Sequence, residues 1–166
     1  MNKYLLIILC VIVISTRNVF SHELDGESNL TVLDMHTGLP HNFVNDIYED
    51  SRGFIWIATY GGGLTRYDGY GFMRSNSCRT LVEDKFNRLW VSFDEGTDII
   101  DLDTYQKAQV KCKTADLSKI LNEPSVFVYL DSKDNIWLLT RTHVYRFVFD
   151  EMGNIAEIAT TMYSSN

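Results

Sequence analysis

Proline is scarce in this sequence, with two residues in 166, and charged residues make up only 22% of the chain. Disordered and fibrous proteins are usually enriched in proline, glycine or charge, so this composition argues against both classes. The hydrophobic fraction is 45% and the aromatic fraction is 13%. That is enough apolar material for the core of one globular domain.

Long apolar runs are also missing after the first residues. Lys3 is followed by an apolar run over residues 4–14, which is shorter than the roughly 20 residues that a membrane-spanning helix needs. Val19 and Ser21 are the branched and small residues at the positions that a signal peptidase reads, so the pattern predicts a secretory signal peptide over residues 1–21. An uncleaved anchor and a lipid attached at Cys10 are the alternatives.

Basic residues are few. Lys3 and Arg17 lie within the predicted signal, so 13 of the 15 Lys and Arg remain against all 22 Asp and Glu, a net charge of −9. Nucleic acid and anionic membrane surfaces are poor partners for such a chain. Cys78 and Cys112 would remain after cleavage. They could form a disulfide in an oxidising compartment, and two separately buried thiols are the alternative.

The main feature that is present is a repeat. An apolar segment ends in an acidic residue, a Trp follows six positions later, and a second apolar segment comes after the Trp. The pairs are Asp50 with Trp56, Asp84 with Trp90, and Asp131 with Trp137. Self-similarity at this period is typical of propellers and solenoids.

Each copy predicts four short strands joined by tight turns, which together make one blade of a β-propeller. The fold class is therefore all-β, with four-stranded antiparallel blades and about three blades of an incomplete propeller after the signal peptide. The predicted strands are 43–49, 54–59, 64–68 and 72–75 in the first copy, 79–83, 88–93, 98–102 and 108–113 in the second, and 126–130, 136–140, 144–150 and 155–160 in the third.

The copies also predict how the chain is divided. Residues 22–37 would hold an N-terminal strand, over 29–35, that closes the last blade of a complete ring. The other divisions are 38–77 as blade 1, 78–113 as blade 2, 114–124 as a loop insertion with room for one helical turn, and 125–166 as blade 3.

The recurrent residues are interpreted as structural. Gly53, Asn87 and Asp134 each stand three positions after the recurrent Asp, and these residue types tolerate a left-handed backbone. The Asp itself can accept hydrogen bonds from the amides of the turn. Consecutive apolar residues around each Trp predict strands covered on both faces, so each Trp would fill the gap between adjacent blades. Truncating a fully buried one should cost roughly 3–5 kcal/mol.

Motifs of catalysis and metal binding are missing. The run Gly61-Gly62-Gly63 lacks the lysine of a phosphate loop, the four histidines lack metal-ligand spacing, and no nucleophile elbow occurs. The sequence therefore predicts no catalytic residues, no metal and no cofactor.

Candidate ligand contacts are expected in loops at one face of the propeller, where aromatic and hydrogen-bonding side chains would suit a sugar. Ordinary solvated loops are the alternative. The candidates are His41, Asn42, Tyr60, Asp94 and Arg141.

Residues 38–68, GLPHNFVNDIYEDSRGFIWIATYGGGLTRYD, resemble the two-component regulator propeller repeat along nearly their whole length. The later copies resemble it more weakly. The second keeps Glu83, Asp84, Trp90, Gly96 and Asp101, and the third keeps Val126, Asp131, Trp137 and Thr140.

The resemblance implies the N-terminal periplasmic sensor portion of a bacterial hybrid two-component sensor histidine kinase, anchored in the inner membrane. It also implies an oligosaccharide ligand, further blades and a kinase portion as partners, and a homodimer in the full-length protein. No kinase motif occurs in this chain, so we expect a non-enzymatic fragment of such a sensor. The alternative is a non-signalling propeller scaffold, or a fragment of a propeller enzyme such as a polysaccharide lyase.

Overall fold

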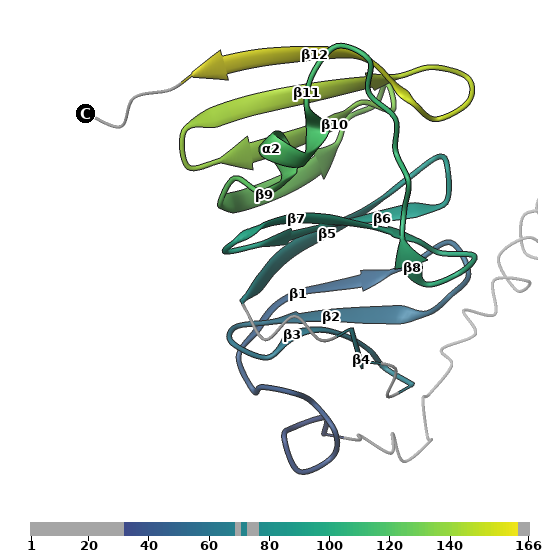
Figure 1. Cartoon of the computed structure of the whole chain (residues 1–166). Coiled ribbons are helices and arrows are strands. Elements are labelled where there is room, and N and C mark those ends of the chain that lie inside the picture. Colours follow the sequence, from purple (N-terminus) through teal and green to yellow (C-terminus); the bar gives the residue numbers. More distant parts are fainter. Residues whose placement is uncertain (1–31, 69–70, 73–76, 163–166) are drawn as a thin grey trace, which may run out of the picture. The chain divides into compact units, whose positions relative to one another are not determined.

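The computed structural model describes residues 32–68, 71–72 and 77–162, which lie within one compact unit, Val32–Asn166. They form three four-stranded antiparallel sheets stacked face to face (Figure 1). The predicted signal peptide lies outside the described residues. Among the described residues, no helix is long and apolar enough to cross a membrane.

Each sheet is a meander in which the strands follow one another in chain order, as predicted for propeller blades. Blade 1 consists of β1 (Val44–Glu49), β2 (Ile55–Thr59), β3 (Gly63–Arg66) and β4 (Gly71–Phe72). Blade 2 consists of β5 (Cys78–Asp84), β6 (Arg88–Phe93), β7 (Gly96–Asp101) and β8 (Gln106–Lys107). Blade 3 consists of β9 (Ser125–Leu130), β10 (Ile136–Thr140), β11 (His143–Phe149) and β12 (Ile155–Met162).

The fourth strand of blade 2 was predicted at residues 108–113, and this is wrong. The outer strand is the short β8, Gln106–Lys107. Beyond it the chain crosses to blade 3, where the Lys111 carbonyl accepts the amide of Ile155 at 2.9 Å. Ala108, Val110 and Cys112 pack one side of this extended connection against the core between blades 2 and 3. Their alternation with polar residues therefore resembles a strand, although the segment forms none in blade 2. Only its first residue bonds to that blade, where the Ala108 amide donates to the Ile99 carbonyl of β7 at 2.8 Å.

The strand predicted at 29–35 is not found in its described part, residues 32–35, which form a loop leading into a turn. Asp34 causes the turn, because its carboxylate accepts the amides of His36 at 2.8 Å and Thr37 at 3.0 Å and so folds the chain back on itself. The predicted insertion does contain one helical turn, α2 (Leu117–Leu121), whose N-cap is Asp116.

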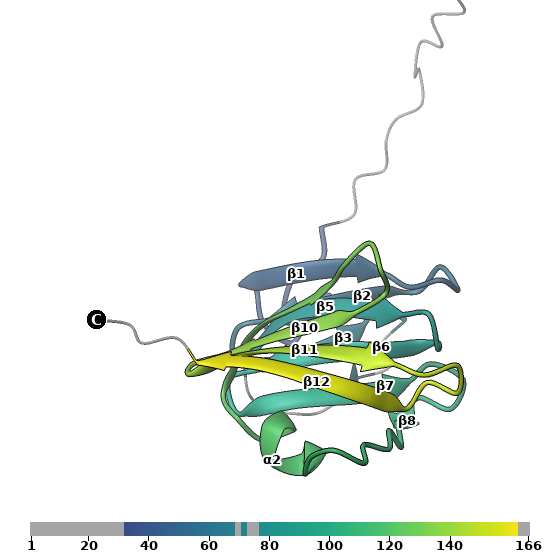
Figure 2. The same ribbon diagram turned by 90° about the horizontal axis from the view of Figure 1, so that it is seen from above.

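The blades pack through their tryptophans. Trp56 of blade 1 is fully buried among residues of blade 2, including Leu81 and Leu89. Trp90 of blade 2 is fully buried against blade 3, where it stacks on Phe147 at a centroid distance of 5.5 Å. Viewed from above, the sheets overlap one another (Figure 2). The predicted inter-blade position is thus confirmed for Trp56 and Trp90.

Trp137 departs from that prediction because it is only half-buried, on the face of blade 3 turned away from blade 2. The cysteines are two separate thiols, Cys78 buried in the core between blades 1 and 2 and Cys112 half-buried near blade 3. Of the two possibilities for this pair, the structure therefore has the one without a disulfide.

Candidate functional site

The recurrent Asp residues hold the turns at one edge of the blade stack. In blade 1, Oδ1 of Asp50 accepts the amides of Arg52 at 3.0 Å and Phe54 at 2.9 Å. Its Oδ2 accepts the indole N–H of Trp56 at 2.7 Å. The sequence predicted the bonds to the turn amides but not the indole bond, which depends on the side-chain directions of two neighbouring strands.

The same geometry recurs in the other blades. The indole of Trp90 donates to Asp84 at 2.7 Å, and that of Trp137 donates to Asp131 at 2.8 Å. The bonds from Trp137, and next those from Asn135, hold the pKa of the Asp131 carboxyl below its usual range. Three positions after each Asp the backbone has a positive φ, as predicted: 82° at Gly53, 60° at Asn87 and 59° at Asp134. These carboxylates form structural hydrogen bonds, and we assign them no role in binding or reacting with a ligand.

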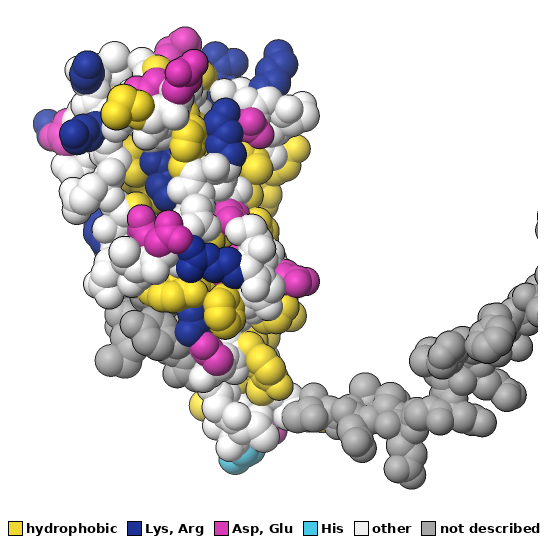
Figure 3. All heavy atoms as spheres, turned by 90° about the vertical axis from the view of Figure 1, so that its right-hand side faces the viewer, with side chains coloured by type: hydrophobic (Ala, Val, Ile, Leu, Met, Phe, Trp, Pro, Cys, Tyr) yellow, Lys and Arg dark blue, Asp and Glu magenta, His cyan; other side chains and the backbone are white. Residues whose placement is uncertain are grey.

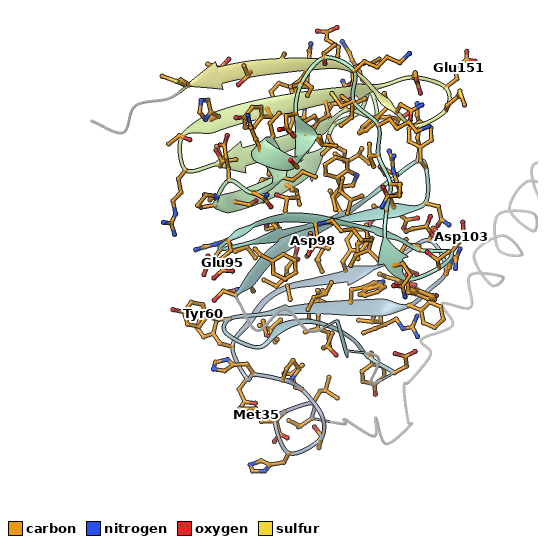
Figure 4. The ribbon with its side chains drawn as sticks, viewed as in Figure 1. Met35, Tyr60, Glu95, Asp98, Asp103 and Glu151 are labelled. Atoms are coloured by element: carbon orange, nitrogen blue, oxygen red, sulfur yellow. The ribbon has the colours of Figure 1, made fainter. Side chains whose placement is uncertain are left out.

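The opposite edge carries the predicted ligand contacts, and we call it the loop face. It is where β1, β5 and β9 begin and where β2, β6 and β10 end. Equivalent backbone bonds close it in all three blades, from Tyr60 N to Phe43 O at 2.9 Å, from Asp94 N to Ser77 O at 3.1 Å, and from Arg141 N to Pro124 O at 3.1 Å. Tyr60, Asp94 and Arg141 therefore occupy equivalent positions. Figure 4 shows Tyr60 and Glu95 at this edge and Asp103 and Glu151 at the opposite one.

Blade 1 contributes an aromatic group to the loop face. Tyr60 is 56% exposed and Phe43 is 62% exposed, and their rings meet edge to face at 6.0 Å. His41 contacts Tyr60 in the same manner at 6.4 Å. Phe43 was not among the predicted contacts, although its place directly before β1 could have shown it. Asn42 differs from the others because its side-chain oxygen accepts the Met35 amide at 2.9 Å and so holds the N-terminal turn.

Blade 2 contributes a paired charge. The carboxylate of Asp94 accepts the Nε–H of Arg79 at 2.6 Å, and the two side chains form an ion pair across the start of β5. Sequence reasoning missed Arg79, because the two residues are 15 positions apart and only the pairing of β5 with β6 brings them together. The pair fixes a planar guanidinium beside a carboxylate at the loop face.

Blade 3 contributes a hydrogen-bond cluster around Glu123, which the sequence did not reveal. Glu123 accepts the hydroxyl of Tyr145 at 2.6 Å and that of Thr140 at 2.8 Å, and its Oε2 lies 3.3 Å from Nδ1 of His143. Burial alone would raise the pKa of the Glu123 carboxyl, but these bonds outweigh it and the pKa is lowered. Burial, and then the bond to Glu123, raises the pKa of Tyr145. Arg141 lies exposed beside this cluster.

The predicted site residues are thus distributed over the three blades of one face. His41 and Tyr60 contact each other, whereas Asp94 and Arg141 belong to blades 2 and 3. No group of His, Cys, Asp and Glu suited to a metal ion occurs within residues 32–68, 71–72 and 77–162. The opposite edge, with the Asp turns, is a mixture of basic, acidic and hydrophobic side chains without a dominant charge (Figure 3).

Comparison with known proteins supports the propeller assignment. Residues 38–61 match the family model "Two component regulator propeller". Among curated protein sequences, none matches the chain.

Two solved structures from B. thetaiotaomicron have the same fold. The extracellular domain of one hybrid two-component system is 21% identical, with a TM-score of 0.54 over 73% of this chain and 17% of that one. Another such domain is 17% identical, with a TM-score of 0.56 over 81% of this chain and 20% of that one. The chain spans about a fifth of the length of these relatives. Residues 38–61, in blade 1, therefore match the two-component regulator propeller repeat, and the three blades share the fold of part of the extracellular domains of hybrid two-component systems.

Proposed function

We propose that this chain is a ligand-sensing module of a two-component signalling protein and that it binds an oligosaccharide at the loop face. The observation that carries the proposal is the exposed pair of aromatic rings, Phe43 and Tyr60, on the same face as the Arg79 and Asp94 ion pair. The repeat at residues 38–61 supports the sensing role, because its family is named for two-component regulators.

The chemistry of the loop face suits a sugar. Aromatic rings that are exposed and held by neighbours offer a flat apolar surface with little loss of side-chain entropy on binding, and the C–H face of a pyranose fits such a surface. The guanidinium and carboxylate of Arg79 and Asp94 offer planar donors and acceptors, which hydroxyl groups can pair with. Sites for small ligands are typically apolar surfaces with a small number of polar groups that point toward the ligand.

An extracytoplasmic location is part of the proposal. It is supported by the predicted signal peptide at residues 1–21 and by the two structural relatives, which are described as extracellular domains. A periplasmic module of this kind would pass its signal to a kinase through further blades and a membrane anchor. We infer that these belong to a longer protein of which this chain is one part, because the chain spans about a fifth of its structural relatives.

Binding of an oligosaccharide panel tests the ligand class. Calorimetry should find at least one saccharide that binds, and Tyr60→Ala should weaken its binding by about tenfold or more, because aromatic anchors dominate small interfaces. Met152→Ala is the matched control, since Met152 is 85% exposed but lies in the turn after β11, at the opposite edge. If Tyr60→Ala and Met152→Ala bind the saccharide equally well, the loop face is not the site.

The coding sequence downstream of Asn166 tests the signalling role separately. The proposal expects further blades, a membrane helix and a histidine kinase to be encoded there. A downstream sequence that encodes none of these in any frame would leave a non-signalling propeller scaffold as the better reading, whatever the saccharide experiment shows.

A further inference from the structure

The segment that begins β5, residues 77–79, holds the ion pair of blade 2 in place. Ser77 directly precedes β5 and is 8% exposed. Its carbonyl accepts the backbone amide of Asp94 at 3.1 Å. Two residues later, Arg79 forms the ion pair with the carboxylate of the same Asp94. The segment therefore fixes both the backbone and the side chain of Asp94 at the loop face.

The same segment also contacts blade 1. The Ser77 hydroxyl accepts the amide of Gly61 at 3.1 Å, and Gly61 directly follows Tyr60 in the turn between β2 and β3. The carbonyl of Cys78 accepts the side-chain amide of Asn45 in β1 at 2.6 Å. Residues 77–79 therefore connect the turn that carries the Tyr60 ring to the ion pair of blade 2.

The turn that carries Tyr60 has little room on its other side. A Cβ at Gly62 would lie 2.6 Å from Oγ1 of Thr59 and 2.9 Å from the backbone carbonyl carbon of Pro40. Glycine, which has no Cβ, permits this close approach of two backbone segments. The turn thus packs closely against the segment that precedes β1, and the bond to Ser77 holds it on the side of blade 2.

We propose that Ser77 is a positioning residue of the ligand site, an inference that rests on the proposed function. Its hydroxyl holds the Tyr60 turn in the orientation that lets the ring and the pair of Arg79 and Asp94 contact the same ligand. Ser77 is buried, so it acts through Tyr60 and not by touching the ligand. Without its bond, the Gly61 amide turns to solvent and the turn adopts further orientations. Binding would then have to order the turn, at a cost in entropy.

Ser51 provides a matched comparison, because it makes a similar bond between the same two blades at the opposite edge. Its hydroxyl donates to the Glu83 carboxylate of β5 at 2.6 Å. Alanine at Ser51 or at Ser77 therefore removes one hydroxyl bond between blades 1 and 2, but it is the Ser77 bond that reaches the turn carrying Tyr60. A general role in holding the blades together would make the two substitutions alike.

Calorimetry with the saccharide that binds the wild-type chain best measures the role of Ser77. Ser77→Ala should weaken binding by about three- to tenfold, the effect of ordering one further flexible group on binding. Ser51→Ala should leave the affinity unchanged, and circular dichroism verifies that both variants fold. Hydrogen exchange without ligand is a second measurement, in which the Gly61 amide should exchange faster in Ser77→Ala than in the wild-type or Ser51→Ala chain.

A double-mutant cycle shows whether Ser77 acts through Tyr60. In the Tyr60→Ala background, Ser77→Ala should cause little further loss of affinity, because the ring that it positions is gone. Additive losses would overturn the proposal. So would equal binding by Ser77→Ala and the wild type, or equal losses in Ser77→Ala and Ser51→Ala. These three results leave the proposed function standing, whereas a wild-type chain that binds no saccharide overturns both.

Discussion

The three Asp and Trp pairs have the same geometry but different surroundings. In each blade the carboxylate holds both the turn and the indole, with Asp-to-indole distances of 2.7, 2.7 and 2.8 Å. Trp56 and Trp90 are fully buried, whereas Trp137 is half-buried because blade 3 has an outward face. The contribution of the tryptophan to the free energy of unfolding should therefore depend on its blade, although the local motif does not change.

Alanine substitutions test this dependence. Trp90→Ala should lower the free energy of unfolding by about 3–5 kcal/mol, because it removes a fully buried side chain and leaves a cavity against Phe147. Trp137→Ala should cost clearly less, since part of the ring already contacts solvent. Urea unfolding of monomeric samples measures both, and equal losses would contradict the assignment of an open face to blade 3.

The depressed pKa of Asp131 has a consequence for acid stability. Bonds from Trp137 and Asn135 favour its ionised form, and the bond from the Asn154 amide likewise lowers the pKa of Asp150. Groups with a lowered folded-state pKa stabilise the fold fully above their unfolded pKa of about 3.9, and this contribution is lost as the pH falls through the folded value. The fold should therefore lose stability below about pH 4.

Unfolding of Asp131→Asn beside the wild-type chain, from neutral to acid pH, measures that contribution. The wild type should be the more stable of the two at neutral pH, and the difference should shrink as the pH falls and Asp131 becomes protonated. A difference that stays constant across the acid range would mean that the carboxylate charge does not stabilise the fold.

At the scale of elements, the inner three strands of each blade and the outer strand of blade 3, β12, could be predicted, whereas the outer strand of blade 2 could not. β2 and β6 carry consecutive apolar residues around the Trp because both faces of these strands are covered. β10 has the same sequence pattern, although Trp137 and Leu139 on its outward face are only half-buried. The outer strands β4 and β8 contain two residues each, which is too short for any periodic signal. The alternation over 108–113 came instead from a connection with one buried side, and hydrophobic pattern alone cannot distinguish that from a strand.

The contact between α2 and blade 2 depends on one glycine. Gly96 begins β7 with a φ of 147°, and a Cβ there would overlap the carbonyl oxygen of Leu121 at the end of α2. Gly61 also has a positive φ, of 79°, but a Cβ there would meet nothing within 4 Å. Alanine substitutions at the two positions therefore distinguish the energetic cost of backbone strain alone from that of strain combined with a steric clash.

Gly96→Ala should be the more destabilising of the two substitutions. Gly61→Ala should cost about 1–2 kcal/mol of unfolding free energy through its left-handed backbone alone. Gly96→Ala carries backbone strain and must also displace the end of α2, so its cost should be larger. Thermal unfolding compares the two, and an equal shift in Tm would show that α2 does not pack closely on β7.

At the scale of the whole molecule, the sequence predicted which face carries the candidate site but not how its residues are arranged. Loop positions follow from strand order, so Tyr60, Asp94 and Arg141 could be assigned to one face before any coordinates. Arg79 and the Glu123 cluster could not, because they arise from side-chain contacts between strands far apart in the sequence. Asn42 lies in a predicted ligand-binding loop, but its side chain accepts the Met35 amide and stabilises the N-terminal turn. Loop position alone therefore does not identify a ligand contact.

The loop face is the surface proposed to recognise the ligand, and amide chemical-shift mapping tests this proposal most directly. During titration with the saccharide that binds best, the shifts should cluster at the start of β1 and β5 and in the loops that hold Tyr60, Asp94 and Arg141. The Asp turns at the opposite edge and the groove lined by Phe127 and Trp137 should stay unchanged. Shifts confined to that groove or to the turns, or no shifts with any saccharide, would contradict the account.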